Sequence, residues 1–245
     1  MRAVLMLHGV DESGSVLSVT PEQLHSLVHA IRASGHRLVP LTTLLESSAS
    51  DLVALTFDDG FRSVSERAAP ILEQLSAPAT LFLTTERLAR DNLWPGQPAD
   101  APRFEIMGWS DVKRLSDNGW AIEAHSLNHP DLRRLGDAEL ERELTLPNQH
   151  IADHIGRRPR VLAYPYGYFD RRVAELARRH FDFAVTTVFR PLGASEDAVR
   201  IPRLDAYYLR APAVHRQFGS KAFMAYLAAR GGLRRLRGHP GEISS

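Results

Sequence analysis

The sequence predicts an α/β fold in which parallel strands and helices form one closed or nearly closed barrel. Short apolar runs alternate with amphipathic helical patterns, at least six such units follow one another, and no obvious linker separates them. With 245 residues, 44% hydrophobic and 24% charged, the chain can bury one barrel-sized core as readily as two smaller ones. The strands are expected at residues 3–7, 52–57, 79–84, 120–124, 161–163 and 183–187.

Start and stop signals delimit the helices between these strands. Thr20 is the expected N-cap of the first helix, with Pro21 at its first position and Gly35 at its end. The other helices are expected from Ser110 to Gly119, over residues 137–156 with a kink or interruption at Pro147, and from Asp170 onward.

The composition changes after Asp205, which predicts a barrel at residues 1–206 and a basic helical extension at 207–245. No acid occurs between Asp205 and Glu242. The basic residues in this interval are Arg210, Arg216, Lys221, Arg230, Arg234, Arg235 and Arg237. We interpret residues 222–229 as part of a solvated or packed terminal helix, with peripheral contact to a membrane surface or a polyanion as the alternative.

Properties of the whole chain exclude several classes of function. A net charge of +1 gives no overall field, so nucleic acid is not expected as the main partner. The absence of cysteine excludes disulfides and thiolate metal sites. The apolar run at residues 3–7 is too short for a signal peptide, and no transmembrane segment is predicted. We therefore expect a cytoplasmic protein, although a chain trimmed of an export signal would look the same.

Two adjacent acids, Asp58 and Asp59, follow the strand at residues 52–57 and precede Gly60. Asp-Asp-Gly is a good turn sequence, so a solvated turn is one interpretation. The other is a functional site, because two carboxylates at one strand end repel each other unless a cation lies nearby or one serves as a base. In β/α barrels the chemistry collects at the carboxyl ends of the strands, where these acids fall.

A long irregular insertion at residues 91–105 follows the strand at 79–84 and is predicted to lie on the same face as the acids. Trp94 could form a wall against a substrate there, or the segment could be a plain surface loop.

Histidine pairs with the spacing His-x-x-x-His occur three times, as His25 with His29, His125 with His129, and His150 with His154. The first and third pairs fall inside predicted helices and are interpreted as surface or boundary residues. The second pair directly follows the strand at 120–124, and Pro130 limits how the chain continues. Only this second pair is therefore expected on the face that holds the two acids.

A carboxylate and two imidazoles from different strand ends are the ligands of a catalytic divalent metal site. Zn²⁺ accepts two histidines and one carboxylate and keeps positions open for water and substrate. Cobalt, nickel or iron would accept the same ligands, so Zn²⁺ is a preference. One acid of the pair can bind the metal, which leaves the other free as a base toward metal-bound water.

An aromatic turn, Tyr164-Pro165-Tyr166-Gly167-Tyr168, follows the strand at 161–163. Such a turn is rigid, its amides can point into a cleft, and its rings can stack on a sugar.

In order along the chain, three motifs resemble those of the polysaccharide deacetylases, the NodB-homology or carbohydrate esterase family 4 enzymes. They are Thr56-Phe57-Asp58-Asp59-Gly60, His125-Ser126-x-x-His129 and Pro165-Tyr166-Gly167. The resemblance spans the chain from Leu5 to about Arg203. It implies a distorted, TIM-like (β/α) barrel of about seven strands and metal-dependent hydrolysis of N-acetyl groups on hexosamines.

The resemblance also implies roles for individual residues. Asp59, His125 and His129 match the metal ligands, and Asp58 matches the catalytic base. The backbone N–H of Tyr166 matches a donor to the oxyanion of the tetrahedral intermediate, a contribution on the order of 3 kcal/mol.

Two positions depart from the family pattern. The third motif usually opens with an arginine that braces the base, and Ala163 stands there; Arg203 is a candidate replacement. The late Leu-x-His motif that supplies a general acid is absent, but Leu5-Met6-Leu7-His8 resembles it in the circularly permuted poly-N-acetylglucosamine deacetylase branch. Because the first and last strands of a closed barrel are neighbours, His8 could act as the general acid, or it could only pack at the strand end.

The sequence thus favours a metal-dependent deacetylase acting on an N-acetylated sugar or polysaccharide. Two alternatives keep the barrel. One is an amidohydrolase of small imides or formamido sugars, and the other is an inactive carbohydrate-binding or scaffold protein, which the missing arginine and the basic tail would fit.

Overall fold

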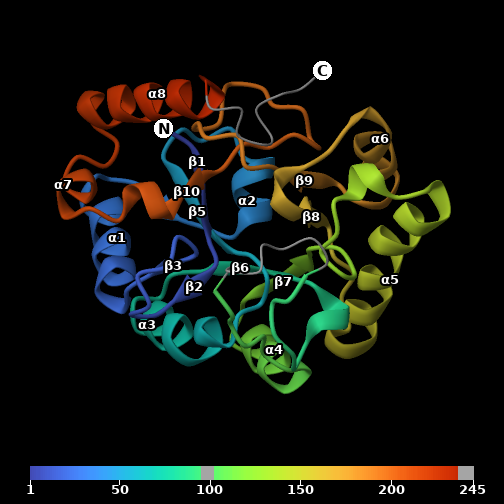
Figure 1. Ribbon diagram of the computed structural model, residues 1–245. Coiled ribbons are helices and arrows are strands. Elements are labelled where there is room, and N and C mark those ends of the chain that lie inside the picture. Colours follow the sequence, from blue (N-terminus) through green and yellow to red (C-terminus); the bar gives the residue numbers. More distant parts are fainter. Residues whose placement is uncertain (95–101, 237–245) are drawn as a thin grey trace.

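The structure is a computed structural model that describes residues 1–94 and 102–236. One parallel sheet curls around the centre of the molecule, and helices surround it (Figure 1). The strands follow the order β10-β1-β5-β6-β7-β8-β9, and β4 also pairs with β5. The strands of this sheet are β1 (Ala3–Leu7), β4 (Arg37–Leu38), β5 (Leu52–Phe57), β6 (Ala79–Leu83), β7 (Ala121–Ala124), β8 (Val161–Ala163), β9 (Phe183–Val185) and β10 (Leu204–Asp205). This confirms the predicted fold class, a β/α barrel whose curled sheet has seven strands in its main path and β4 as an eighth strand beside β5.

The six predicted strands are all present, with ends that differ by at most two residues. β1, β5 and β8 have the predicted bounds, whereas β6 ends at Leu83, β7 begins at Ala121 and β9 ends at Val185. A separate pair of short strands, β2 (Gly9–Val10) and β3 (Ser18–Val19), follows β1.

The helices α1 (Pro21–Ala33), α5 (Asp137–Ile155) and α6 (Arg171–His180) match their predictions. Thr20 caps α1 through a capping box with Gln23. The predicted cap of α4 (Trp109–Asp117) was wrong, because the cap is Gly108, whose N–H donates to the Asp111 side chain. Pro147 lies inside α5 without interrupting it. The remaining helices are α2 (Leu41–Glu46), α3 (Ala69–Gln74), α7 (Pro212–His215) and α8 (Lys221–Leu236).

A segment near the end of the sheet joins its two edges. Ile201 pairs with Val185 of β9, and Leu204 of β10 pairs with Leu5 of β1. Arg203 lies between these two pairings and is 1% exposed, so its side chain is enclosed by the barrel. The closure of the sheet therefore places the positively charged side chain of Arg203 inside the barrel.

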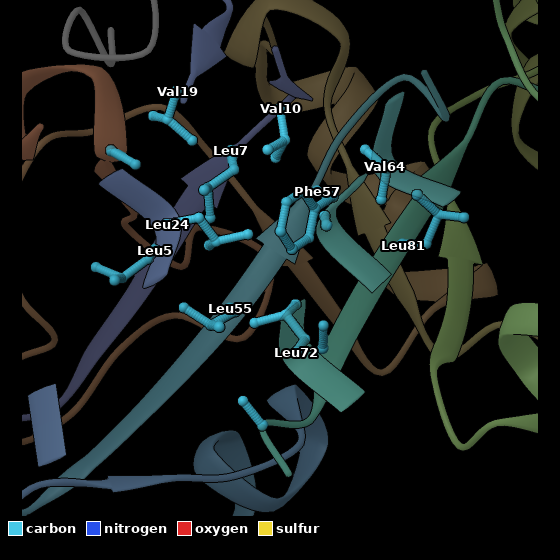
Figure 2. Packing of buried hydrophobic residues seen from close by; sticks show 14 of the residues in the cluster. Leu5, Leu7, Val10, Val19, Leu24, Leu55, Phe57, Val64, Leu72 and Leu81 are labelled. Atoms are coloured by element: carbon cyan, nitrogen blue, oxygen red, sulfur yellow. The ribbon is translucent and has the colours of Figure 1, made fainter. Parts of the chain in front are cut away.

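Apolar side chains fill both faces of the sheet. One set lies between the sheet and helices α1 and α3 and includes Leu5, Leu55 and Phe57 (Figure 2). The alternate residues of β5, Leu52 and Ala54, belong to a second cluster with residues from the other strands of the sheet. Because side chains alternate along a strand, the side chains of Thr56 and Asp58 point to the same face of the sheet as those of Leu52 and Ala54.

The carboxyl-terminal part of the described chain packs against the barrel. Phe223 and Leu227 of α8 are buried in the main apolar cluster, and the Tyr226 hydroxyl donates to the Tyr208 carbonyl at 2.6 Å. The domain boundary proposed at residue 206 stays a prediction. No helix in the described ranges is both long and apolar enough to cross a bilayer.

Candidate metal centre and active site

Asp59, His125 and His129 come together where β5 and β7 end. Their ligand atoms all lie within 4.8 Å of one another, and all three side chains are buried. The Nε2 atoms of His125 and His129 each lie 3.4 Å from Oδ1 of Asp59. These are the residues that the sequence predicts as metal ligands, and the fold brings them into one group.

The backbone of this region takes unusual conformations. Asp59, His129 and Tyr166 have φ angles of 70°, 62° and 60°, in the left-handed region that residues other than glycine seldom occupy. Each such residue costs on the order of 1–3 kcal/mol, and such strain clusters at functional sites. These turns thus position the three residues at a cost in local stability.

The donor set fits a divalent cation. Nδ1 of His125 donates to the Ala163 carbonyl at 2.8 Å, which fixes the ring with Nε2 directed toward Asp59. Nδ1 of His129 is buried and lacks a hydrogen-bond partner in the described part of the chain. Ligands about 2.1 Å from a tetrahedral metal ion are about 3.4 Å apart, which matches both spacings to Asp59.

The electrostatics prepare these groups as ligands. Burial opposes ionisation of Asp59, but the hydrogen bond with His125 and the nearby histidines outweigh it and hold the pKa of Asp59 below its ordinary value. Burial lowers the pKa of His129 to about 3, despite the opposing charge of Asp59. His129 is therefore neutral at physiological pH, as a metal ligand must be.

Asp58 is held apart from this group by Arg203. The two guanidinium nitrogens Nη1 and Nη2 donate to the two carboxylate oxygens, both at 2.7 Å, and Nη1 also reaches the Thr56 hydroxyl at 3.2 Å. Nε of Arg203 donates to the Thr186 carbonyl at 3.0 Å. Burial raises the pKa of Asp58, but the charge of Arg203 outweighs it, so the net shift is downward. The structure thus places Arg203 where the missing family arginine would act.

Aromatic rings line the other side of the ligand group. Trp94 stacks on the His129 ring at a centroid distance of 4.6 Å, and Tyr166 meets the same ring edge-on at 4.4 Å. Burial raises the pKa of Tyr166 to about 12, so its phenol stays protonated. Trp94 therefore belongs to the site; part of the insertion predicted at 91–105 lies outside the described residues.

His8 follows directly on β1 and is half-buried. Its charge contributes to the pKa shifts of Asp58, Asp59 and Asp205, so it lies within electrostatic range of all three. His8 therefore shares the face with the ligand group, and its role as general acid stays a prediction.

Sequence reasoning missed one residue that supports the site. Glu143 of α5 is buried, and its carboxylate accepts hydrogen bonds from the backbone N–H groups of Leu127 and Asn128, both at 2.9 Å. The Asn128 side chain donates to it as well, at 2.9 Å. These bonds fix the loop that carries His129. An acid in a helix is ordinarily a solvated residue, so the sequence held no signal for this role.

The other two histidine pairs lie outside the site, as predicted. His25 and His29 are exposed on α1 with ring centroids 4.4 Å apart. His150 hydrogen-bonds to Thr85, and His154 stacks on a tryptophan.

Residues 46–181 match the polysaccharide deacetylase family, more than half of the chain. The chain belongs to this family. Its members are hydrolases that act on amide C–N bonds and depend on a divalent metal ion, and the group of Asp59, His125 and His129 provides a site for such an ion.

Relatives and solved structures of the polysaccharide deacetylases support this membership. The protein YxkH of Bacillus subtilis is 22% identical over 231 residues, which cover 91% of this chain and 75% of that protein. The poly-beta-1,6-N-acetyl-D-glucosamine N-deacetylase of Staphylococcus epidermidis is 19% identical over 202 residues, covering 76% of this chain and 67% of the relative.

Two solved structures share the fold. The deacetylase PplD of Streptococcus pyogenes, in complex with acetate, superposes with a TM-score of 0.71 at 20% identity and covers 83% of this chain and 91% of its own. IcaB of Ammonifex degensii superposes with a TM-score of 0.69 at 22% identity. The match covers 87% of this chain and 96% of the IcaB chain. At these identities the likeness establishes the barrel fold alone.

Proposed function

We propose that this protein removes N-acetyl groups from N-acetylhexosamine units of a glycan or sugar precursor. The observation that carries the proposal is that the two adjacent acids, Asp58 and Asp59, lie in different environments. Asp59 faces the Nε2 atoms of two imidazoles at 3.4 Å, while the charge of Asp58 is balanced by a bidentate arginine. One carboxylate is thereby prepared as a ligand and the other as a base, which is what hydrolysis of an amide requires.

Asp59, His125 and His129 would hold the cation, with Zn²⁺ preferred for two imidazoles and one carboxylate. When bound, such a cation supplies Lewis acidity, which polarises the acyl carbonyl and makes water more acidic. Trp94 and Tyr166 cover the His129 ring and keep that side of the site apolar.

Asp58 serves as the base in this proposal. Its carboxylate accepts a proton from the water whose oxygen attacks the acetyl carbon, and Arg203 keeps it ionised beforehand. The backbone N–H of Tyr166 donates to the oxygen that becomes negative, a contribution on the order of 3 kcal/mol. His8 gives a proton to the sugar nitrogen as the C–N bond breaks, so that acetate and a free amine leave.

The decisive substitution is Asp58→Asn, tested by acetate release from an N-acetylglucosamine oligomer together with metal analysis of the same samples. We expect turnover to fall by at least a thousandfold while the metal content stays at the wild-type level, because Asn cannot accept the proton but leaves the three ligands intact.

Wild-type turnover in the Asp58→Asn protein would refute the assigned base. Acetate release from small amides but from no N-acetylated sugar would instead refute the substrate class. A purified wild-type protein that binds no divalent ion and gains no activity with Zn²⁺ or Co²⁺ would favour a scaffold.

A further inference from the structure

A groove lies between helix α1 and the segment that contains α7, and the proposed function does not use it. We call it the α1–α7 groove. Its volume is about 920 Å³, the size of pockets that hold small organic molecules. Figure 1 shows the two helices beside each other on one side of the barrel. No residue that lines this groove belongs to the group of Asp59, His125 and His129, so it is a separate candidate site.

Small side chains on α1 create the space. Ser26, Ala30 and Ala33 line the groove and recur every three or four residues, so they share one face of the helix. Because these side chains are short, they leave a hollow in front of α7. Pro212 and Phe218 line the opposite wall. The apolar part of a ligand would therefore meet apolar surface on both sides.

The polar groups of the groove are nitrogen donors. His25 and His29 are exposed on α1, with ring centroids 4.4 Å apart. Arg216 is exposed on the other side and forms no ion pair with any acid in the described residues. No acid lines the groove. Imidazole and guanidinium N–H groups without a neighbouring carboxylate match a ligand that carries negative charge.

A buried histidine in the wall also points to a ligand. His215 lines the groove and is 5% exposed, and neither of its ring nitrogens has a hydrogen-bond partner of normal geometry among the described residues. Burial lowers the pKa of His215 and outweighs the opposite effect of the nearby Leu209 carbonyl, so the ring is neutral at physiological pH. A buried polar group without a partner costs about 1–3 kcal/mol. A polar group of a bound ligand would supply the missing partner.

The arrangement of the nitrogens does not suit a metal ion. In the part of the chain that the structure describes, only Asp59, His125 and His129 bring three ligand atoms within 4.8 Å of one another. The three histidines of the groove therefore do not converge on one point. The positive charge of Arg216 also repels a cation, which leaves an anion as the matching occupant.

We propose that the α1–α7 groove binds a small organic anion. The carboxylate or phosphate of this ligand contacts Arg216 and the imidazoles of His25 and His29, while its apolar body lies against Ala30 and Phe218. The inference goes beyond the proposed function and does not depend on it, because binding in this groove needs neither the metal site nor an N-acetylated sugar.

Titration calorimetry of the full chain with three related probes tests the proposal. The probes are 2-naphthyl phosphate, 2-naphthoate and the uncharged 2-naphthamide. We expect saturable binding of at least one anion, at least tenfold tighter than that of the amide, because only the anions pair with Arg216. The anion that binds more tightly identifies the charged group of the ligand. Equal affinity for the amide, or no saturable binding of either anion, would overturn the proposal.

Two variants locate the bound probe. Ala33→Trp fills the groove and should abolish binding, whereas Arg216→Glu should weaken binding of the anions at least tenfold, since it exchanges an attraction for a repulsion. The matched control is Arg179→Glu, which makes the same charge change at an exposed position of α6 and should bind like the wild type. Equal weakening in both charge variants, or unchanged binding in Ala33→Trp, would place the probe elsewhere and refute the groove.

Circular dichroism melts verify that each variant folds. Acetate release from an N-acetylglucosamine oligomer is measured separately on the wild type. A wild type that binds the anionic probe in the groove but releases no acetate would count against the deacetylase and leave the proposal for the groove standing.

Discussion

Two histidine pairs with identical spacing lie in very different surroundings in this molecule. His125 and His129 follow β7 in a loop, are buried, and face Asp59. His25 and His29 lie on α1, exposed to solvent. The helix holds His25 and His29 with their ring centroids 4.4 Å apart, slightly closer than the 4.8 Å between the rings of His125 and His129. Proximity of two imidazoles therefore does not make a site.

The difference lies in what surrounds each pair. The strand-end pair has a third ligand from another strand, a carbonyl that fixes the tautomer of His125, and a carboxylate, Glu143, that fixes the loop. No such third ligand joins the pair on α1 within the residues that the structure describes. Convergence of buried groups from several strand ends makes the site, and His-x-x-x-His spacing alone does not.

The largest expected effect separates the two pairs directly. His125→Ala should lose the bound metal and at least a thousandfold in acetate release, because it removes a ligand and the several kcal/mol that the metal contributes to catalysis. His25→Ala on α1 should keep both, with stability within about 0.5 kcal/mol of the wild type. Metal analysis and rates on both proteins make the check. Similar metal loss in the two would show that the pair on α1 also binds.

Strand positions and the ligand group could be predicted because both depend on local pattern. Residues 3–7 and 161–163 are apolar runs with clear ends, and acids or histidines directly follow the strands that carry the site. β10 spans only Leu204–Asp205, too short for any periodicity to show. The contact of Arg203 with Asp58 joins residues 145 positions apart, and only the closure of the barrel creates it.

Arg203 tests how far a site depends on such long-range contacts. Arg203→Met should lower stability by about 3–5 kcal/mol, because it leaves the buried Asp58 charge without its partner. Arg203→Lys, which keeps the charge but not the bidentate geometry, should lose less. Thermal unfolding at neutral pH measures both. Since Arg203 lowers the pKa of Asp58, its stabilisation is present above the ordinary carboxyl pKa and fades as pH falls through the lowered value.

Replacing Arg203 should also alter how the rate depends on pH. Without the guanidinium, burial raises the pKa of Asp58, so the acid limb of kcat/KM should move to higher pH in Arg203→Met, with a smaller move in Arg203→Lys. An acid limb that stays in place in both variants would separate Asp58 from the step that the limb reports.

His8 extends the comparison to a third setting, a single histidine at a strand end. If position at the carboxyl face decides function, His8→Gln should lower kcat on an N-acetylated oligomer about a hundredfold and leave the metal content unchanged, because the amine then departs without its proton. The discriminating substrate is an aryl acetate, whose phenolate needs no proton to leave. His8→Gln should hydrolyse it at nearly the wild-type rate if His8 protonates the leaving group. An equal loss on both substrates would mean that His8 does not protonate the leaving group and supports the site only by packing at the end of β1.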